Sequence, residues 1–333
     1  IGFNIKDAMT IYNCYKSKSK DIVSDNIYQI INDIEDINFP KIDEIALEQG
    51  IEIDSQNRIE ACIIYVMKSL VFQNGDTYLE YDEILRSVQN YLKLELNSDL
   101  FEEYLYNLEK KYEIVKYNGV YYLTDMFKAE NNIVNQIVYL SSKKTEKVNN
   151  INEYVLSLEK KEGILYNDKQ REAIVKALEN NILIITGGPG TGKTTIIKAI
   201  VKLYSEINRF SFEELCERVA LLAPTGRASK RMSETTGLPA STIHRFLKWD
   251  KENNEFCVNE YNPNPQELII VDESSMVDIN LFSSLFKGLT KNIKLILVGD
   301  HNQLPSVGPG RVLKDLIDSE IVDTINLEYL YRQ

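Results

Sequence analysis

The glycine-rich run at residues 187–194, GGPGTGKT, constrains the fold of this chain more than any other feature of its sequence. It matches the pattern G-x-x-x-x-G-K-[ST], follows an apolar β-like run at 182–186 and precedes a helical run at 195–204. In a loop between a strand and a helix, glycines let successive backbone N–H groups turn inward around phosphate oxygens, and the helix start adds its positive dipole end. The sequence therefore predicts a nucleotide-binding loop.

Residues 146–333 alternate between short apolar runs and helix-length segments. The apolar runs are rich in Ile, Leu and Val and lie at 182–186, 219–223, 268–271, 294–298 and 324–327. This alternation is typical of a parallel sheet that is covered by helices on both faces and binds ligands at the carboxyl ends of its strands. We predict an α/β fold of the P-loop NTPase type for this region.

The glycine-rich loop supplies most of the candidate nucleotide contacts. We expect Lys193 to place its charge on the β and γ phosphates of ATP, and Thr194 to ligate Mg²⁺. The predicted nucleotide-binding residues of the loop are Gly188, Pro189, Gly190, Thr191, Gly192, Lys193, Thr194 and Thr195.

Two further apolar runs are followed by side chains suited to ATP hydrolysis. The third run ends at Asp272, which we expect in the Mg²⁺ shell, and Glu273, which we expect to polarise the attacking water. The alternative for such acids is a helix cap without a catalytic role. The fourth run leads to Gln303, whose neutral amide can sense the γ-phosphate by hydrogen bonding without adding charge.

The first 145 residues have a different character. Residues 1–75 show apolar positions three and four apart, which predicts short helices. Helical stretches at about 80–92 and 98–110 then precede alternating apolar segments around Asn118-Gly119, a strong signal for a hairpin. Helix, helix and hairpin in that order favour a winged-helix-like module, and a small helical spacer with a hairpin fits the same pattern.

The composition of the chain argues against several classes of protein. The chain has 38 basic and 50 acidic residues and a net charge of −12, which argues against an indiscriminate polyanion binder but leaves room for a local basic groove. No apolar run reaches the roughly 18 residues of a membrane span. The four cysteines fit no metal or redox spacing. We expect a cytoplasmic monomer that has no membrane partner.

Taken in order, the motifs resemble those of superfamily 1 helicases, and most of all the RecD-like (RecD/TraA) DNA helicases of the long, N-terminally extended type. The resemblance spans nearly the whole chain. It is carried by the stretches 188–195, 223–228 (APTGRA), 241–246 (STIHRF), 272–276 (DESSM), 299–310 and the final Tyr-Arg-Gln at 331–333.

The resemblance implies roles for further residues. Gln170 matches the glutamine that hydrogen-bonds adenine in the family, and Arg332 matches an arginine that completes the ATPase site. With Lys193, Glu273 and Gln303, Arg332 makes up the expected catalytic set. The implied contacts to single-stranded DNA are Pro224, Thr225, Gly226, Arg227, Thr242 and His244.

The resemblance also divides the chain into modules. It implies a helix-hairpin-helix-like region at 1–75, a winged-helix-like module at 76–145 and a RecA-like motor domain at 146–333, with a small hairpin inserted at about 247–265. The hairpin at 36–41 has no glycine to hold a DNA phosphate, which favours a structural role for it. The inserted hairpin is either a pin that splits duplex DNA or a surface excursion.

One main functional hypothesis follows. We expect the parent protein to be an ATP-dependent DNA helicase that uses Mg²⁺, moves 5′→3′ along single-stranded DNA, meets duplex junctions and serves DNA repair or recombination. Because the chain starts at Ile1 and ends at Gln333, we expect a fragment that stops where a second RecA-like domain begins, binds ATP and unwinds poorly. The alternatives are an RNA-directed superfamily 1 helicase, the helicase half of a conjugative relaxase, and a non-enzymatic nucleotide-dependent DNA-binding scaffold.

Overall fold

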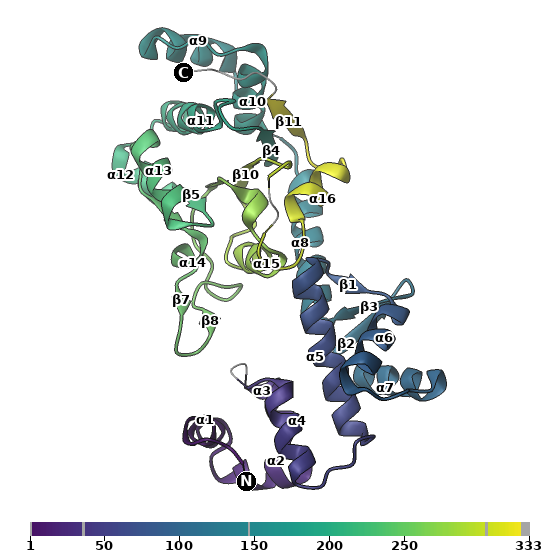
Figure 1. Ribbon diagram of the computed structural model, residues 1–333. Coiled ribbons are helices and arrows are strands. Elements are labelled where there is room, and N and C mark those ends of the chain that lie inside the picture. The colour runs from purple at the N-terminus through teal and green to yellow at the C-terminus, as the bar shows by residue number, and fades with distance from the viewer. Residues whose placement is uncertain (1, 35–36, 146, 304–305, 328–333) are drawn as a thin grey trace. The chain divides into compact units, whose positions relative to one another are not determined.

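The computed structural model describes residues 2–34, 37–145, 147–303 and 306–327. The chain forms two compact units, Ile1–Phe127 and Lys128–Gln333, each with its own hydrophobic core (Figure 1). The division between them falls in the first turn of helix α8 (Thr124–Ser142). The three functional modules suggested by the sequence stay a prediction.

The first unit begins with a group of short helices, as the apolar periodicity indicates. Polar side chains start two of them: Asn4 accepts from the Asp7 N–H at 2.9 Å, and Asn38 accepts from the Lys41 N–H at 3.4 Å. The helices are α1 (Ile5–Tyr15), η1 (Lys16–Lys18), α2 (Ser19–Asn26), α3 (Gln29–Asp33), α4 (Phe39–Glu48) and the longer α5 (Gln56–Asn74).

A buried ion pair joins α4 to α5. The Arg58 guanidinium donates to both carboxylate oxygens of Asp43, at 2.7 and 2.8 Å, and to the Ile53 carbonyl at 2.6 Å. The Tyr28 hydroxyl donates to the same carboxylate at 2.8 Å, and burial together with Asp43 raises the pKa of Tyr28. Only 6% of Arg58 is exposed, so its charge depends on Asp43 for compensation.

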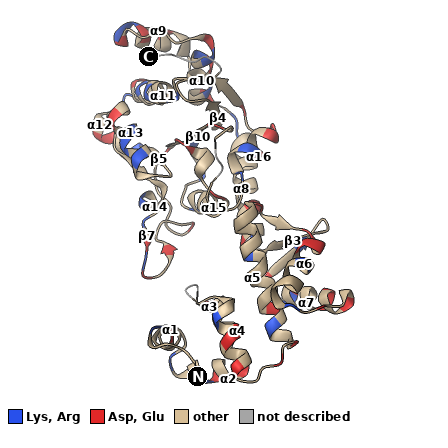
Figure 2. Ribbon diagram, in the orientation of Figure 1, with Lys and Arg blue, Asp and Glu red and all other residues tan. Residues whose placement is uncertain are grey.

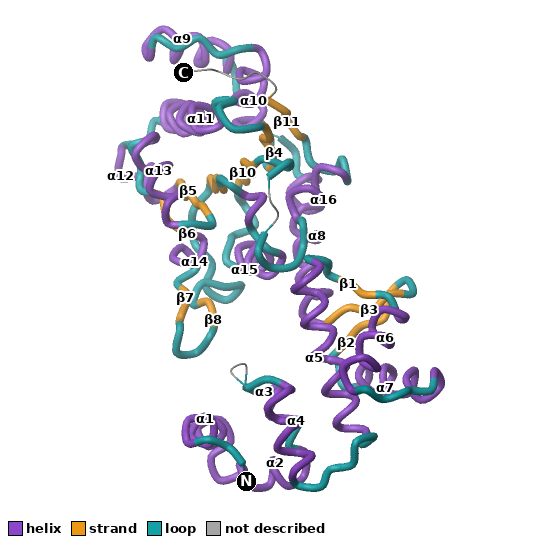
Figure 3. Tube along the Cα trace, viewed as in Figure 1, coloured by secondary structure: helices purple, strands orange, loops and turns teal. Residues whose placement is uncertain are grey.

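Helix α5 leads into a module of two helices and a hairpin (Figure 3). Strand β3 pairs antiparallel with both β1 and β2, and Asn118 and Gly119 have φ of 50° and 86°, as a tight hairpin turn requires. The predicted helices and hairpin are confirmed in this order, and the winged-helix-like character of the module stays a prediction. The elements are β1 (Tyr78–Leu79), α6 (Tyr81–Leu92), α7 (Ser98–Lys110), β2 (Ile114–Tyr117) and β3 (Val120–Leu123).

A six-stranded parallel sheet forms the centre of the second unit (Figure 1). Its strands lie in the order β11-β4-β10-β9-β5-β6. The edge strand β6 (Ala240–Thr242) has no counterpart in the predicted runs, because its three half-buried residues form no apolar run. The five predicted strands are confirmed as β4 (Ile182–Gly187), β5 (Val219–Ala223), β9 (Leu268–Val271), β10 (Lys294–Gly299) and β11 (Thr324–Leu327).

Helices cover both faces of this sheet, which confirms the predicted α/β architecture (Figure 1). One face carries α8, α15 (Ile279–Lys287) and α16 (Val312–Asp318). On this face, Asn132 of α8 donates to the carbonyl and the hydroxyl of Ser283 in α15, both at 3.0 Å. The helices that share a core with the other face are α9 (Ile151–Glu162), α10 (Asp168–Glu179), α11 (Lys193–Asn208), α12 (Phe212–Arg218) and α13 (Gly226–Thr236).

The predicted insertion is confirmed as a short helix and a small hairpin (Figure 3). Helix α14 (Ile243–Phe246) is followed by β7 (Trp249–Asp250) and β8 (Glu255–Phe256), which pair antiparallel. Across the whole described part of the chain, no helix combines the length and the apolar character that crossing a membrane requires.

Replacing Asp43 by alanine is expected to lower the free energy of unfolding by about 3–5 kcal/mol, because it leaves the buried Arg58 charge without a partner. Urea denaturation followed by circular dichroism measures the change. Glu172→Ala is the matched control: it removes an exposed partner of Lys169, and such surface pairs contribute about 1 kcal/mol or less. Equal losses in the two variants would contradict the role given to the buried pair.

Candidate active site

The parallel sheet brings three loops to one edge. Strand β10 lies between β4 and β9, with Gly299 opposite Thr186. The loops that leave the carboxyl ends of these strands contain the glycine-rich run 187–194, the acidic pair 272–273 and the stretch 300–303. Ligands of open α/β sheets bind at this edge.

The amino group of Lys193 closes over its own loop. Its Nζ donates to the Gly187 carbonyl at 2.5 Å and to the Gly188 carbonyl at 2.9 Å. The Thr191 hydroxyl donates to the same Gly188 carbonyl at 2.9 Å. Phosphate oxygens carry charge and accept more strongly than carbonyls, so a bound polyphosphate can take over this amino group.

The Gln170 side chain forms a hydrogen bond to the glycine-rich loop. Its amide Nε2 donates to the Thr191 carbonyl at 3.2 Å, and its Oε1 accepts from the Asn167 N–H at 3.2 Å in a capping box at the start of α10. A Cβ at Gly192, where φ is 88°, would meet that Nε2 at 2.6 Å, so the loop needs glycine there. The adenine contact expected of Gln170 stays a prediction.

Burial and charge oppose each other at Lys193 and Asp272. Burial lowers the pKa of Lys193, against the nearby carboxylates of Asp300 and Asp272, which raise it. Burial raises the pKa of Asp272, and the Glu273 N–H and the Lys193 charge only partly offset this. The charged forms of Lys193 and Asp272 are therefore only partly compensated by the neighbouring protein groups.

Glu273 lies at a strained turn directly after β9. Its φ is 52°, in the left-handed region, and its N–H donates to Asp272 Oδ1 at 2.9 Å. The next residue, Ser274, starts the turn η2 (Ser274–Met276) and donates its hydroxyl to the Val298 carbonyl of β10 at 2.8 Å. The Glu273 side chain makes no capping bond to η2, which favours the catalytic interpretation over the cap.

The loop after β10 places Asp300 within reach of the lysine charge. Asp300 is 5% exposed, and its carboxylate accepts from the Asn302 N–H at 3.0 Å. The sequence analysis gave Asp300 no role, although an acid directly after a buried strand is the same signal that pointed to Asp272. Gln303 is exposed at this edge, and Arg332 lies outside the described residues.

The acidic side of this edge suits a magnesium–nucleotide complex. Mg²⁺ in such sites takes one or two protein oxygens and fills its other positions with phosphate oxygens and water. Asp272 offers a half-buried carboxylate with only partial compensation, and Thr194 follows Lys193 at the start of α11. The donor set therefore fits the Mg²⁺ that the sequence motifs imply.

The predicted DNA contacts follow β5 and β6 at the same edge. Thr225 and Thr242 each start a helix: their hydroxyls accept from the N–H groups of Ala228 and Arg245, both at 3.2 Å. The remaining predicted contacts are half-buried or exposed, namely Pro224, Gly226, Arg227 and His244. The sheet brings these residues together, and their contact with DNA stays a prediction.

Helix α13 adds positive charge beside the nucleotide edge (Figure 2). Lys230 and Arg231 are exposed on it, and the charge of Arg231 lowers the pKa of both Lys193 and Asp272. The positive charge of Arg231 therefore reaches both side chains that are expected to meet the phosphates and Mg²⁺.

Three aromatic rings join His244 to the inserted hairpin. Trp249 packs against Phe256 with ring centroids 4.7 Å apart, and the His244 ring lies 6.3 and 5.7 Å from them. Trp249 is 36% exposed, and its ring contacts connect the hairpin to the end of α14.

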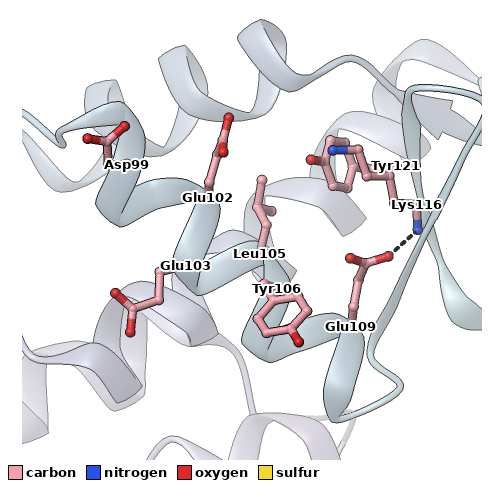
Figure 4. Close-up of a pocket in the computed structure, with 8 residues that line it drawn as sticks. All are labelled: Asp99, Glu102, Glu103, Leu105, Tyr106, Glu109, Lys116 and Tyr121. Carbon is pink, nitrogen blue, oxygen red and sulfur yellow. Dashed lines mark hydrogen bonds between the residues drawn. The ribbon is translucent and has the colours of Figure 1, made fainter.

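One face of the module of two helices and a hairpin in the first unit is mainly acidic. Helix α7 lines a pocket of about 420 Å³ beside the hairpin on this face (Figure 4). Carboxylates repel DNA phosphates, so this face is unsuited to hold a DNA backbone. The lining residues are Asp99, Glu102, Glu103, Leu105, Tyr106, Glu109, Lys116 and Tyr121.

In the described part of the helix-hairpin-helix-like region, both the side chain and the N–H of Lys41 have partners within the protein. Lys41, the cation of its hairpin, forms an ion pair with the largely buried Asp7. Asn38 occupies the Lys41 N–H at the start of α4. Both observations favour the structural role that the missing glycine suggested.

Comparison with known proteins adds a family. Residues 1–78 match the helix-hairpin-helix (HHH) domain of ATP-dependent RecD2 DNA helicases, and residues 170–309 match an AAA domain family. An ATP-dependent RecD2 DNA helicase from Deinococcus radiodurans is 27% identical over 345 residues, which cover 100% of this chain and 46% of that protein. The chain is similar to RecD-like DNA helicases along its entire length. The resemblance that the motifs indicated is thereby confirmed.

Other relatives match about half of the chain. The RecBCD enzyme subunit RecD of Mycobacterium tuberculosis is 38% identical over 167 residues, which cover 45% of this chain and 29% of that protein. A Pif1 helicase structure from Candida albicans covers 51% of this chain and 41% of its own, at 24% identity and a TM-score of 0.36. The chain thus spans less than half the length of the RecD-like relatives named here.

Asp272→Asn is expected to stabilise the nucleotide-free protein at neutral pH. Since burial raises the pKa of Asp272 above 3.8, its charged form weakens folding, and the isosteric amide removes that charge while it keeps the acceptor for the Glu273 N–H. The gain should shrink as the pH falls toward 3.8, because the wild-type carboxyl then becomes protonated too. Urea unfolding between pH 7 and pH 4 measures it.

Asp250→Asn is the control with the opposite sign. Hydrogen bonds from the Glu252 N–H and the Asn253 side chain lower the pKa of Asp250, so loss of its charge should destabilise the protein at pH 7. An Asp272→Asn variant less stable than the wild type at pH 7 would show that the carboxylate is better compensated than the structure indicates.

Proposed function

We propose that this chain is the ATP-binding part of an ATP-dependent DNA helicase. The observation that carries the proposal is the meeting, at one sheet edge, of the Lys193 loop with the half-buried Asp272 and the buried Asp300. The names of its relatives support a DNA substrate, since they include RecD2 DNA helicase and the RecD subunit of RecBCD enzyme. An RNA-directed helicase stays the alternative, and stimulation by DNA and RNA oligonucleotides separates the two.

We propose a step for each side chain of the site. Lys193 leaves its two carbonyls and binds the β and γ phosphates, while the loop N–H groups surround them. Glu273 accepts a proton from the attacking water, and Gln303 senses the γ-phosphate. Thr194 and Asp272 would hold Mg²⁺, which would supply positive charge against the phosphates. We propose that Arg332 stabilises the charge that develops on the phosphates in the transition state.

We further propose 5′→3′ movement on single-stranded DNA, with duplex junctions as substrates and a role in DNA repair or recombination in the cytoplasm. The RecD-like resemblance supports these points. A strand-displacement assay on a longer form of the protein, with substrates that carry a 5′ or a 3′ single-stranded tail, tests polarity. Displacement only from the 3′-tailed substrate would contradict the proposal.

The 333 residues alone should bind ATP–Mg²⁺ but hydrolyse it slowly and unwind no duplex. Motors of this superfamily close two RecA-like domains on ATP, and the described residues form one such parallel sheet. An arginine that the second domain supplies on closure raises the rate of ATP hydrolysis about 10³- to 10⁵-fold. Turnover of these residues and of the longer protein, with and without single-stranded DNA, checks this; full DNA-stimulated turnover by the 333 residues would refute it.

Lys193→Ala is expected to reduce ATP turnover at least about 100-fold and to weaken ATP–Mg²⁺ binding, because it removes the charge that meets the phosphates. The fold should persist, since Lys193 makes only bonds within its own loop. Lys198→Ala is the matched control, a lysine of the same helix that faces Glu162. Unchanged turnover in Lys193→Ala, or equal loss in both variants, would overturn the site assignment.

A further inference from the structure

A side-chain hydrogen bond joins the end of β4, directly before the glycine-rich loop, to the loop that carries Gln303. The Thr186 hydroxyl and His301 Nδ1 lie 2.8 Å apart, and Thr186 belongs to the last residue pair of β4 and β10. Only 2% of Thr186 is exposed, and a buried hydroxyl that loses its partner costs free energy. His301 therefore has a fixed place beside the strand that enters the glycine-rich loop.

Both partners neighbour groups that meet phosphate in the proposed site. Thr186 directly precedes Gly187, whose carbonyl accepts the Lys193 amino group. His301 lies two residues before Gln303. A shift of either residue thus moves a phosphate-binding group.

The turn that contains His301 is otherwise shaped by local bonds. The Asp300 carboxylate accepts from the Asn302 N–H at 3.0 Å, and the Asp300 carbonyl accepts from the Gln303 N–H at 3.1 Å. These bonds define the turn but do not fix it to the sheet. On another side, His301 and Gln303 line a cavity of about 200 Å³ with Ser275, so open volume borders the loop.

We propose that His301 is a positioning residue: its hydrogen bond to Thr186 holds Gln303 at the γ-phosphate and sets how strongly the site prefers a triphosphate over a diphosphate. The inference rests on the proposed function, because it deepens the role given to Gln303. Neither His301 nor Thr186 needs to touch the nucleotide. Loss of the bond should therefore affect ligands that have a γ-phosphate and spare those that lack one.

Calorimetric binding of Mg²⁺–AMP-PNP and Mg²⁺–ADP to the 333-residue chain tests this. Thr186→Val and His301→Ala, which remove the bond, should each weaken AMP-PNP binding about 3- to 10-fold, the range of one hydrogen bond, and leave ADP binding unchanged. Thr186→Ser and His301→Asn keep a polar atom at the same place and should restore the preference. The double variant Thr186→Val/His301→Ala should lose no more than either single variant.

Two results would overturn the inference. One is an unchanged preference for AMP-PNP in both Thr186→Val and His301→Ala. The other is an equal weakening of AMP-PNP and ADP binding, which a merely structural role predicts. If the unaltered chain bound neither nucleotide, the proposed function itself would fail and this inference with it.

Discussion

The parallel pairing of β4 with β10 is the constraint on which the rest of the site depends. It sets Thr186 opposite Gly299, so the glycine-rich loop and the Asp300 loop leave the sheet side by side. Strand β9 then adds Asp272 on the other side of β10. A one-residue slip in the register would turn alternate side chains to the other face and separate the lysine from its acids.

Without a ligand, keeping Lys193 and Asp272 charged in the site costs free energy, and a bound ligand can lower this cost. Burial works against the charge of both Lys193 and Asp272, and the carbonyls of Gly187 and Gly188 are modest partners for an ammonium group. A polyphosphate with its magnesium would compensate both charges together. The same compensation explains why the nucleotide-free protein is expected to be less stable with Asp272 than with asparagine.

The sequence predicts the motifs and their strands well, because each apolar run is local and each loop follows it directly. The edge strand β6 is missed because three half-buried residues give no periodic signal. The partnership of Thr186 with His301 spans 115 positions and arises only from the strand order, which the sequence does not display. For the same reason the hydrogen bond from Gln170 to the Thr191 carbonyl was not predicted.

A structure of the chain with Mg²⁺ and AMP-PNP tests the central claim most directly. The account predicts Lys193 Nζ on the β and γ phosphates and away from the Gly187 carbonyl, Asp272 beside the magnesium ion, and Gln303 at the γ-phosphate. A nucleotide bound elsewhere, or a γ-phosphate beyond the reach of Lys193 and Gln303 together, would contradict it.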